Sequence, residues 1–394
     1  MASRPWSPAA TAFSRGDLTP LGRWFWTVDK LLVTLVLSLI ACGVIAVAAA
    51  SPAAAQRLSG RNYHYEDLFF LKRQIYWVLA GLPVLFGVSM LPIAWAKRLS
   101  IAGTIVFLLA LMAVPLIGAG ANGAQRWLAY GGFQLQPSEF FKPLFVVTTA
   151  WLLALRFEDR SLPTMQLSFG LLVIVAALLV QQPDYGQTAL IVAVWGVQAL
   201  LAGMSIGVLV GLGLVGALGL AIAYLTVSHV TERIDKFLVG GGDTYQIDKA
   251  LDCFRAGGLL GVGPGEGQMK FRLPEPHTDY IFSVIGEEFG LIACLFIAAL
   301  YITIVVRVFI LLLDEDEPFV FLAAAGLATQ FGLQATINMM VNLKLLPSKG
   351  MTLPFISHGG SSFIALCMGM GLLLAFTRRN PYRNASPYAE RWRA

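Results

Sequence analysis

The sequence predicts an all-α polytopic membrane protein with about ten transmembrane helices, cytoplasmic termini and one long periplasmic loop between helices 7 and 8. Its 394 residues are 57% hydrophobic and only 13% charged, with a mean hydropathy of +0.70. Soluble domains carry about 25% charged residues. Uncharged runs also recur along the chain, and many reach the roughly 20 residues that cross a bilayer core.

The apolar runs divide the chain into a tail at 1–30, one membrane domain at 31–377 and a basic tail at 378–394. The predicted transmembrane segments are 31–50, 75–96, 99–121, 139–155, 162–182, 188–204, 206–230, 280–306, 318–343 and 358–377. The uncharged stretch after Asp184 is too long for one helix, and Gly203-Met204-Ser205 marks its break. No clean cleavage site follows the first apolar run, so we interpret it as a spanning helix rather than a signal peptide.

The orientation is predicted from the basic residues, which are in excess on the cytoplasmic side of membrane proteins. Their totals split evenly between the two sides, so only their distribution is informative. Short turns assigned to the inside carry Lys97 and Arg98, then Arg156 and Arg160, and the C-terminal tail is basic. Many outer basic residues lie together in the long loop 232–279, where they could serve a ligand. Both termini are therefore predicted to be cytoplasmic.

Composition also excludes several classes of function. The net charge of +5 is spread along the chain, and no basic run is long enough for a nucleic-acid-binding arm. Three of the four cysteines lie in apolar runs, and Cys253 has no obvious disulfide partner. The histidines are far apart and lack metal-ligand spacing, so no metal site is predicted.

The loop 232–279 is the only long polar segment. Ile247, Leu251 and Phe254 fall on one helical face, which predicts a short amphipathic helix resting on the membrane surface. The stretch GGLLGVGPGEGQMK, residues 257–270, follows this helix. It lacks the GK[ST] ending and the preceding strand of a phosphate-binding loop, so we expect a flexible loop there.

Charges that interrupt apolar sequence are the most informative feature, because ionisable groups within a membrane are costly and usually functional. In QPSEFFKP, Glu139 and Lys142 stand three residues apart and share one helical face. Only 13 uncharged residues separate Lys142 from Arg156. The helix therefore begins at or before Glu139, with both charges at the outer rim of the bilayer. An interfacial ion pair that anchors the helix end is an equally good interpretation.

Further polar motifs fall on the same predicted outer side. Asp279, in LPEPHTDYIFSVIGEEFG, stands where the long loop re-enters the membrane, and by itself a helix cap would explain it. Glu287 and Glu288 lie two turns later and could be structural pair partners. Asp184, in QPDYGQT, is explained by a tight capped turn. The segment LPSKGMTLPFISHGGSS has the composition of irregular backbone that lines a cavity.

Arg126, in NGAQRWL, joins these motifs at the outer face. Carboxylates and cations that converge at one membrane face indicate a site for a large anionic head group whose lipid tail stays in the bilayer.

Five separated signatures resemble the SEDS family (shape, elongation, division and sporulation) of bacterial cell-wall polymerases: GAQRW, QPSEFFK, QPDYGQ, LPEPHTDYIFSVIGEEFG and LPSKGMTLPFISHGGSS. The resemblance covers nearly the whole span from the first helix to Arg379. Lys349, in LPSKGMTLP, resembles the division members more than the elongation members. Two positions depart from the family pattern, and they concern fine substrate contacts: His358 stands where tyrosine is common, and YQIDKALDCF replaces a YQ-x-x-x-S pattern.

The resemblance implies a peptidoglycan glycosyltransferase that polymerises lipid II into glycan strands for septal wall synthesis. Making a β-1,4 linkage from an α-linked sugar pyrophosphate inverts the anomeric carbon, so one direct displacement is sufficient. The attacking hydroxyl needs a general base, and the departing undecaprenyl pyrophosphate needs positive charge. Asp279 matches the family's catalytic aspartate. The predicted substrate-binding residues are Arg126, Glu139, Lys142, His277, Lys349 and Ser361.

No ligand pattern demands a cofactor, although Mg²⁺ or Mn²⁺ could share the phosphate role. The partners implied by the resemblance are lipid II, a class B penicillin-binding transpeptidase (FtsI-like), other divisome membrane proteins and membrane lipids. The implied location is the inner membrane of a bacterium, at the division septum.

Two other functions remain open. A lipid II flippase without bond chemistry would also place polar residues among spanning helices, but along a path through the midplane rather than at the outer rim. A non-catalytic scaffold for division proteins would have no need for Asp279 in particular.

Overall fold

The computed structural model describes residues 19–59, 64–121, 124–130, 133–226, 228, 230–231, 235, 244–347 and 350–378. Eight of the described helices are long and apolar enough to cross a membrane: α2 (Lys30–Leu58), α3 (Phe69–Ser89), α4 (Ile93–Ile117), α5 (Pro137–Glu158), α6 (Thr164–Gln181), α8 (Ile206–Thr226), α11 (Ile281–Leu312) and α12 (Pro318–Asn342). Two shorter apolar helices are α7 (Tyr185–Leu201) and α13 (Gly360–Phe376). These helices correspond one for one to the predicted segments, and together they confirm the polytopic helical fold.

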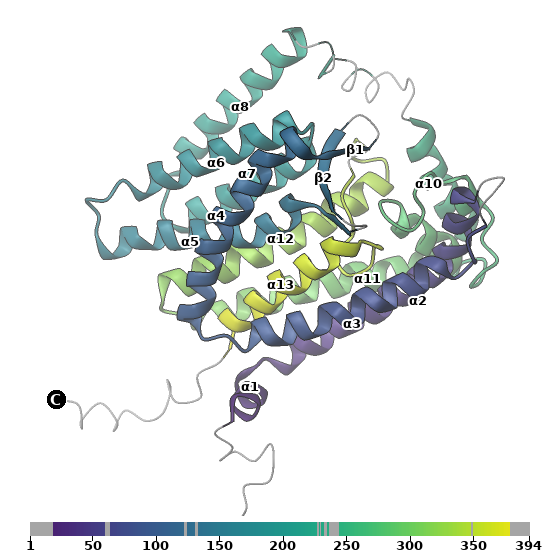
Figure 1. Cartoon of the computed structure of the whole chain (residues 1–394), viewed down its shortest axis with the longest axis horizontal. Helices are drawn as coiled ribbons and strands as arrows, with labels where there is room; N and C mark the ends of the chain where they lie inside the picture. The colour runs from purple at the N-terminus through teal and green to yellow at the C-terminus, as the bar shows by residue number, and fades with distance from the viewer. Residues whose placement is uncertain are drawn as a thin grey trace, which may run out of the picture.

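Contacts between distant segments show that the chain enters and leaves the bundle at one end. Arg307, near the end of α11, donates to the Asp29 carboxylate at the start of α2 over 2.6 Å. Arg378, just after α13, donates to the carbonyl of Met90 over 3.3 Å, at the turn that follows α3. Helix α1 (Pro20–Thr27) lies at this end, and α10 (Thr244–Gly257) lies towards the other (Figure 1). The cytoplasmic assignment of the first end stays a prediction.

Helices α5 and α12 form the centre of the bundle and are the most buried of the candidate spans. Gln198 of α7 joins them, because its Nε2 donates to the carbonyls of Val146 (2.9 Å) and Leu322 (3.2 Å). Glycine at position 326 leaves room for this side chain, because a Cβ there would lie 2.4 Å from Gln198 Nε2. In contrast, α8 lies at the edge of the bundle and exposes large apolar side chains such as Leu225 (Figure 1). Such a surface is suited to lipid.

The predicted turn between the second and third spans was wrong by several residues. Helix α3 ends at Ser89 and α4 begins at Ile93, so Lys97 and Arg98 lie in the second turn of α4 and not in a loop. Pro92 precedes α4, and proline lacks the N–H needed to continue the hydrogen bonding of α3. The position of the turn between α3 and α4 is therefore set by Pro92 and not by the charged residues.

A small antiparallel sheet between α4 and α5 was not predicted. Its strands β1 (Ala119–Ala121), β2 (Ala124–Tyr130) and β3 (Phe133–Leu135) follow in the order β1-β2-β3, with Ala119 opposite Trp127 and Leu128 opposite Leu135. The sequence predicts helix as far as residue 121, which is wrong by four residues because α4 ends at Ile117. Glycine is a poor helix former, and α4 ends directly before Gly118. The sheet carries Arg126 on β2.

The predicted amphipathic helix is confirmed as α10, but its expected placement on the membrane surface was wrong. Ala250 and Cys253 are buried in a cluster with Tyr280 and Val284 at the start of α11, and Ile247 on the same helix is buried as well. The apolar face therefore packs on protein, next to the segment that carries Asp279.

The glycine-rich stretch after α10 is a folded element and not the expected flexible loop. Helix α11 breaks at Gly290 (φ 78°), and the stretch pairs with the backbone groups that the break leaves free. Leu291 N–H donates to the Gly258 carbonyl over 3.0 Å, and Val262 N–H to the Glu287 carbonyl over 2.9 Å. A Cβ at Gly261 would lie 2.2 Å from the Glu288 carbonyl, so this close approach requires glycine. The short helix η1 (Met269–Arg272) follows.

Candidate active site

Glu139 and Lys142 form a buried ion pair in the first turns of α5. Pro137 occupies the first turn, where its missing N–H has no consequence, and the acidic Glu139 suits the positive end of the helix dipole. Lys142 Nζ donates to Glu139 Oε1 over 2.9 Å and to Gln334 Oε1 over 3.1 Å, and Gln187 Nε2 donates to Glu139 Oε1 over 2.8 Å. The two charged side chains are only 2% and 5% exposed. The predicted ion pair is therefore enclosed by the protein.

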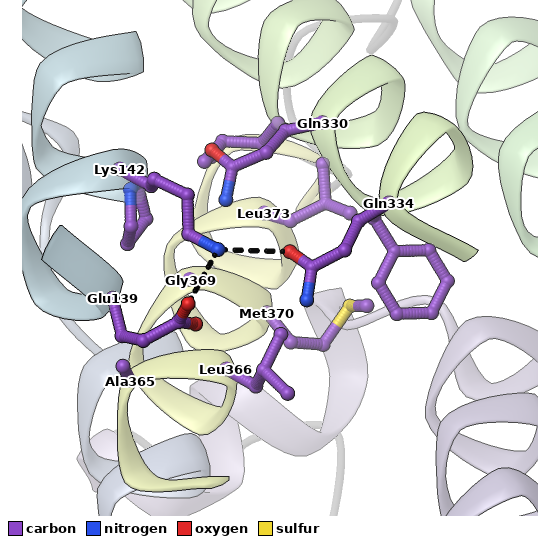
Figure 2. A pocket seen from close by; sticks show the side chains of 12 residues that line it. Glu139, Lys142, Gln330, Gln334, Ala365, Leu366, Gly369, Met370 and Leu373 are labelled. Atoms are coloured by element: carbon purple, nitrogen blue, oxygen red, sulfur yellow. Dashed lines mark hydrogen bonds and ion pairs between the residues drawn. The ribbon is translucent and has the colours of Figure 1, made fainter. Parts of the chain in front are cut away.

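A pocket adjoins this pair between α5, α12 and α13 (Figure 2). Apolar side chains such as Phe331 and Leu366 form most of its wall, while Lys142, Glu139, Gln330 and Gln334 supply its polar end. A lysine ammonium has three N–H donors, and the bonds to Glu139 and Gln334 use two of them. The pocket thus combines apolar walls with the Glu139–Lys142 ion pair at its polar end.

Arg126 and Asp184 form a second charged group in this region. Arg126 Nε donates to the Gln182 carbonyl over 3.2 Å, a further N–H donates to the Pro183 carbonyl, and Nη1 lies 3.9 Å from Asp184 Oδ1. Asp184 does occupy the N-cap position of α7, as a capped turn requires, but its side chain is buried and faces a cation. Burial raises the pKa of its carboxyl, and the positive charge of Arg126 opposes the rise.

Asp279 lies two residues before α11, and its backbone and its carboxylate have different environments. Its carbonyl accepts hydrogen bonds from Asn338 Nδ2 (3.0 Å) and Asn342 Nδ2 (2.9 Å), both on α12. Its carboxylate makes no hydrogen bond to any described residue. Burial raises the pKa of this carboxyl to about 7, the charge of Glu275 adds to the rise, and Arg126 opposes it. A half-buried carboxylate with a pKa near neutrality, and with no hydrogen-bond partner among the described residues, suits proton transfer.

His277 packs against a second histidine beside Asp279. Its ring lies 5.6 Å from that of His358 and 4.1 Å from that of Phe70. His358 Nδ1 lies 3.0 Å from Gln74 Oε1, whereas His277 Nδ1 is buried without a hydrogen-bond partner in the described part of the chain. Burial and the charge of Arg73 lower the pKa of His277 to about 4. Burial, the charge of His277 and the charge of Arg73 lower the pKa of His358 to about 3. Both imidazoles are therefore neutral near pH 7.

The other predicted residues have different placements. Ser361 is buried in the first turn of α13, where its Oγ accepts from the Gln136 N–H at 3.5 Å. Lys349 falls outside the described residues. Glu139 and Lys142 contact each other, but among the described residues neither contacts Asp279. The charge of Arg126, in contrast, lowers the pKa of Asp279.

Several polar residues of the site were missed in the sequence. Gln334, Asn338 and Asn342 follow one another at four-residue intervals on α12 and contact Lys142 or Asp279. Their spacing in an otherwise apolar segment was an available signal. Within the described residues, no three His, Cys, Asp or Glu side chains lie close enough together to hold a metal ion.

Apolar helices in this number, with charged groups buried among them, define a polytopic membrane protein. A family model described as cell cycle protein (FTSW_RODA_SPOVE) matches residues 29–382, and the chain belongs to this family.

Named relatives agree with that assignment. The probable peptidoglycan glycosyltransferase FtsW of Caulobacter vibrioides is 42% identical over 377 residues, which are 95% of each chain. The protein of the same name from Nitrosomonas europaea is 34% identical and covers 90% of this chain and 93% of its own length. The predicted family and its division-type character are therefore confirmed.

Solved structures share the fold. A chain from a peptidoglycan synthase complex that coordinates polymerization and crosslinking matches with a TM-score of 0.74 and 28% identity, covering 89% of this chain and 97% of that chain. The rod shape determining protein RodA of Thermus thermophilus matches with a TM-score of 0.65 and 27% identity, covering 91% and 98% of the two chains.

Proposed function

We propose that this protein is a peptidoglycan glycosyltransferase that polymerises lipid II into glycan strands, with Asp279 as its general base. The observation that carries the proposal is the environment of the Asp279 carboxylate. It lacks a hydrogen-bond partner among the described residues, and its pKa is raised to about 7. Family membership and the FtsW relatives support the same reaction.

In the proposed reaction, Asp279 takes the proton of the attacking sugar 4-hydroxyl. The hydroxyl oxygen then forms a bond to the anomeric carbon of the donor from the face opposite the pyrophosphate. The bond from that carbon to the pyrophosphate oxygen breaks, and undecaprenyl pyrophosphate leaves. The single displacement inverts the anomeric carbon from α to β. A base with a pKa near the working pH is both sufficiently ionised and sufficiently basic for this step.

The leaving pyrophosphate carries negative charge that cations stabilise. Lys142 is proposed to supply its third N–H donor from the pocket, and Glu139 to orient it through their 2.9 Å contact. Arg126 is proposed to supply a second cation, since its charge already influences both Asp184 and Asp279. His277, Lys349 and Ser361 are retained as candidate substrate contacts.

A divalent cation is proposed to act only with the substrate. Mg²⁺ binds through phosphate oxygens and one or two carboxylates and keeps several waters. The described residues form no cluster of three acidic, histidine or cysteine ligands, so the pyrophosphate would supply most of the ligands to Mg²⁺ or Mn²⁺.

The proposed setting is the division septum of the bacterial inner membrane, where a class B penicillin-binding transpeptidase would crosslink the new strands. The similar chain from a synthase complex that coordinates polymerization and crosslinking supports such a partner. Other division proteins are proposed to bind as well. The flippase alternative is disfavoured because the charged groups Arg126, Asp184, Glu139 and Asp279 all precede or begin helices near one end of the bundle.

The test is polymerisation of labelled lipid II by the purified protein with its transpeptidase partner. We expect glycan polymer from the wild type and at least about 10²-fold less from Asp279→Asn, since asparagine cannot accept the hydroxyl proton. Asp159→Asn, an exposed change in the turn after α5, is the matched control and should retain activity. Normal polymer from Asp279→Asn would remove this residue from the mechanism and return the flippase to consideration.

A further inference from the structure

Four amide side chains occupy every fourth position of α12: Gln330, Gln334, Asn338 and Asn342. Residues spaced by four lie on one face of a helix, one above the other. All four are buried, with exposed fractions between 0% and 8%. Burying an amide in a membrane helix is unfavourable unless it is hydrogen-bonded. A row of them in an apolar span therefore calls for a specific explanation.

Gln334, in the middle of this row, contacts Lys142 of the ion pair in α5. Gln334 Oε1 accepts from Lys142 Nζ over 3.1 Å, and its Nε2 donates to the Thr352 carbonyl over 3.1 Å. Gln334 thus joins Lys142 to the irregular segment that precedes α13.

Asn338 and Asn342, at the C-terminal end of the row, contact the backbone of Asp279. Asn338 Nδ2 donates both to the Asp279 carbonyl (3.0 Å) and to the Met351 carbonyl (2.6 Å). Asn342 Nδ2 donates to the same Asp279 carbonyl over 2.9 Å. A carbonyl oxygen has two lone pairs, so the two amides occupy both acceptor positions of Asp279.

The orientation of Asn342 is itself fixed. Its Oδ1 accepts from the backbone N–H of Ser283 (3.2 Å) and from the Ser283 hydroxyl (2.7 Å). These two donors identify the oxygen end of the amide, so the nitrogen end must face Asp279. Ser283 belongs to the first turn of α11, and the contact therefore joins the start of α11 to the end of α12.

We infer that Asn338 and Asn342 are positioning residues, which hold the backbone of Asp279 so that its carboxylate faces the acceptor sugar. The inference rests on the proposed function. Gln334 and Asn342 are eight residues apart on one rigid helix, a distance of about 12 Å along its axis. The same helix thereby sets the position of Asp279 relative to Lys142, the groups that we assign to the two ends of the reaction. A displacement of about 1 Å in such a group can lower the rate about 10²-fold.

A purely structural role is the competing explanation, because loss of a buried amide contact also lowers stability. The two roles differ in what they change. Loss of positioning lowers kcat in protein that remains folded and leaves KM for lipid II nearly unchanged, because neither amide is proposed to touch substrate. It also lets the Asp279 carboxylate reach water more freely, so its pKa falls and the acid limb of the pH profile moves to lower pH. A purely structural role only reduces the fraction of folded protein.

The experiment compares Asn338→Ala and Asn342→Ala with wild type in the lipid II assay with the partner present. We expect kcat to fall about 10- to 100-fold per folded molecule, with an acid limb at lower pH. Thr336→Ala, on the exposed face of the same helix, is the control and should behave as wild type. Ser283→Ala removes only the hydroxyl that orients Asn342, and we expect a smaller fall in kcat with the same direction of pH shift.

Ser283→Ala decides the question if either asparagine variant does not fold. Unchanged kcat and pH profile in the folded variants would overturn the inference while leaving the proposed function intact, provided that Asp279→Asn is inactive. Normal polymerisation by Asp279→Asn would instead reject the proposed function, whatever the asparagine variants do.

Discussion

The ammonium group of Lys142 lies 2.9 Å from the carboxylate of Glu139, one turn earlier on α5, and both side chains are buried. Replacing one partner of a buried pair leaves an unpaired charge, which typically lowers stability by about 3–5 kcal/mol. Replacing both by neutral residues of similar size is often close to neutral. The pair therefore allows its structural role to be separated from a catalytic one.

We predict that Lys142→Met lowers both the melting temperature and the polymerisation of lipid II. The double variant Glu139→Gln/Lys142→Met should recover most of the melting temperature, because no unpaired charge remains, but it should stay inactive because the leaving pyrophosphate lacks its cation. Thermal unfolding in detergent and the lipid II assay measure the two effects. Recovery of activity in the double variant would mean that the pair is only structural.

The pH dependence of polymerisation is predicted from Asp279. A general base acts in its ionised form, and its pKa is raised from the usual range to about 7. The polymerisation rate should therefore reach its plateau above this pKa and fall about tenfold per pH unit below it. Initial rates measured across this range, with folding checked at each pH, give the position of the limb. A limb near pH 4 would show that the carboxyl is not shifted in the working enzyme.

Glu275 offers a matched check on that assignment. Burial is the main cause of the raised pKa of Asp279, and the negative charge of Glu275 is the second. The Glu275 side chain itself is exposed, and it accepts a hydrogen bond from Thr278 Oγ1 over 2.8 Å. Glu275→Gln should therefore move the acid limb to lower pH, by less than about one unit because an exposed charge is screened by water. The rate on the high-pH plateau should change little.

The sequence was most informative where a charge interrupts an apolar run. The start of α5 before Glu139 followed from the number of uncharged residues before Arg156, and helix α10 followed from its apolar periodicity. The amides of α12 were missed because uncharged side chains do not interrupt such a run. Their partners, including Thr352 and Asp279, are also distant in sequence, so only the tertiary structure brings them together.

Lys270, in the glycine-rich stretch where a flexible loop was expected, is another residue whose partners are distant in sequence. Its ammonium group pairs with Glu288 and also donates to the Ala49 carbonyl over 3.0 Å, with both charged side chains almost completely buried. Glu287 accepts from the backbone N–H groups of Met269 (2.6 Å) and Lys270 (2.8 Å). The interpretation of these glutamates as structural pair partners therefore agrees with the contacts. Their partner could not be identified without the fold of the loop.

We predict that Lys270→Met destabilises the protein by about 3–5 kcal/mol, since Glu288 would remain charged and buried. The double variant Lys270→Met/Glu288→Gln should regain most of this loss. Lys72→Met is the control, because Lys72 pairs with Glu66 at an exposed position and such pairs contribute little. Thermal unfolding of the three variants in detergent tests the prediction. Equal stability of Lys270→Met and wild type would show that the loop is not held by this pair.

The orientation of the bundle in the membrane is the remaining prediction. Leu260, in the folded stretch after α10, is 79% exposed, and Ser161 lies exposed in the turn between α5 and α6. Helix α5 runs from the end that carries Asp279 to the other, so these two positions should lie on opposite sides of the membrane. The basic residues predict that Leu260 faces outward and Ser161 faces the cytoplasm.

Cysteine labelling in cells decides between the two orientations. Three native cysteines are buried and Cys42 is partly buried, so a variant without them supplies the background. With the outer membrane permeabilised, an impermeant maleimide should label Leu260→Cys in intact cells, and label Ser161→Cys only after lysis. The reverse pattern would place Asp279 on the cytoplasmic side. Lipid II would then have to be polymerised before export, which contradicts the proposed reaction outside the membrane while leaving the fold unchanged.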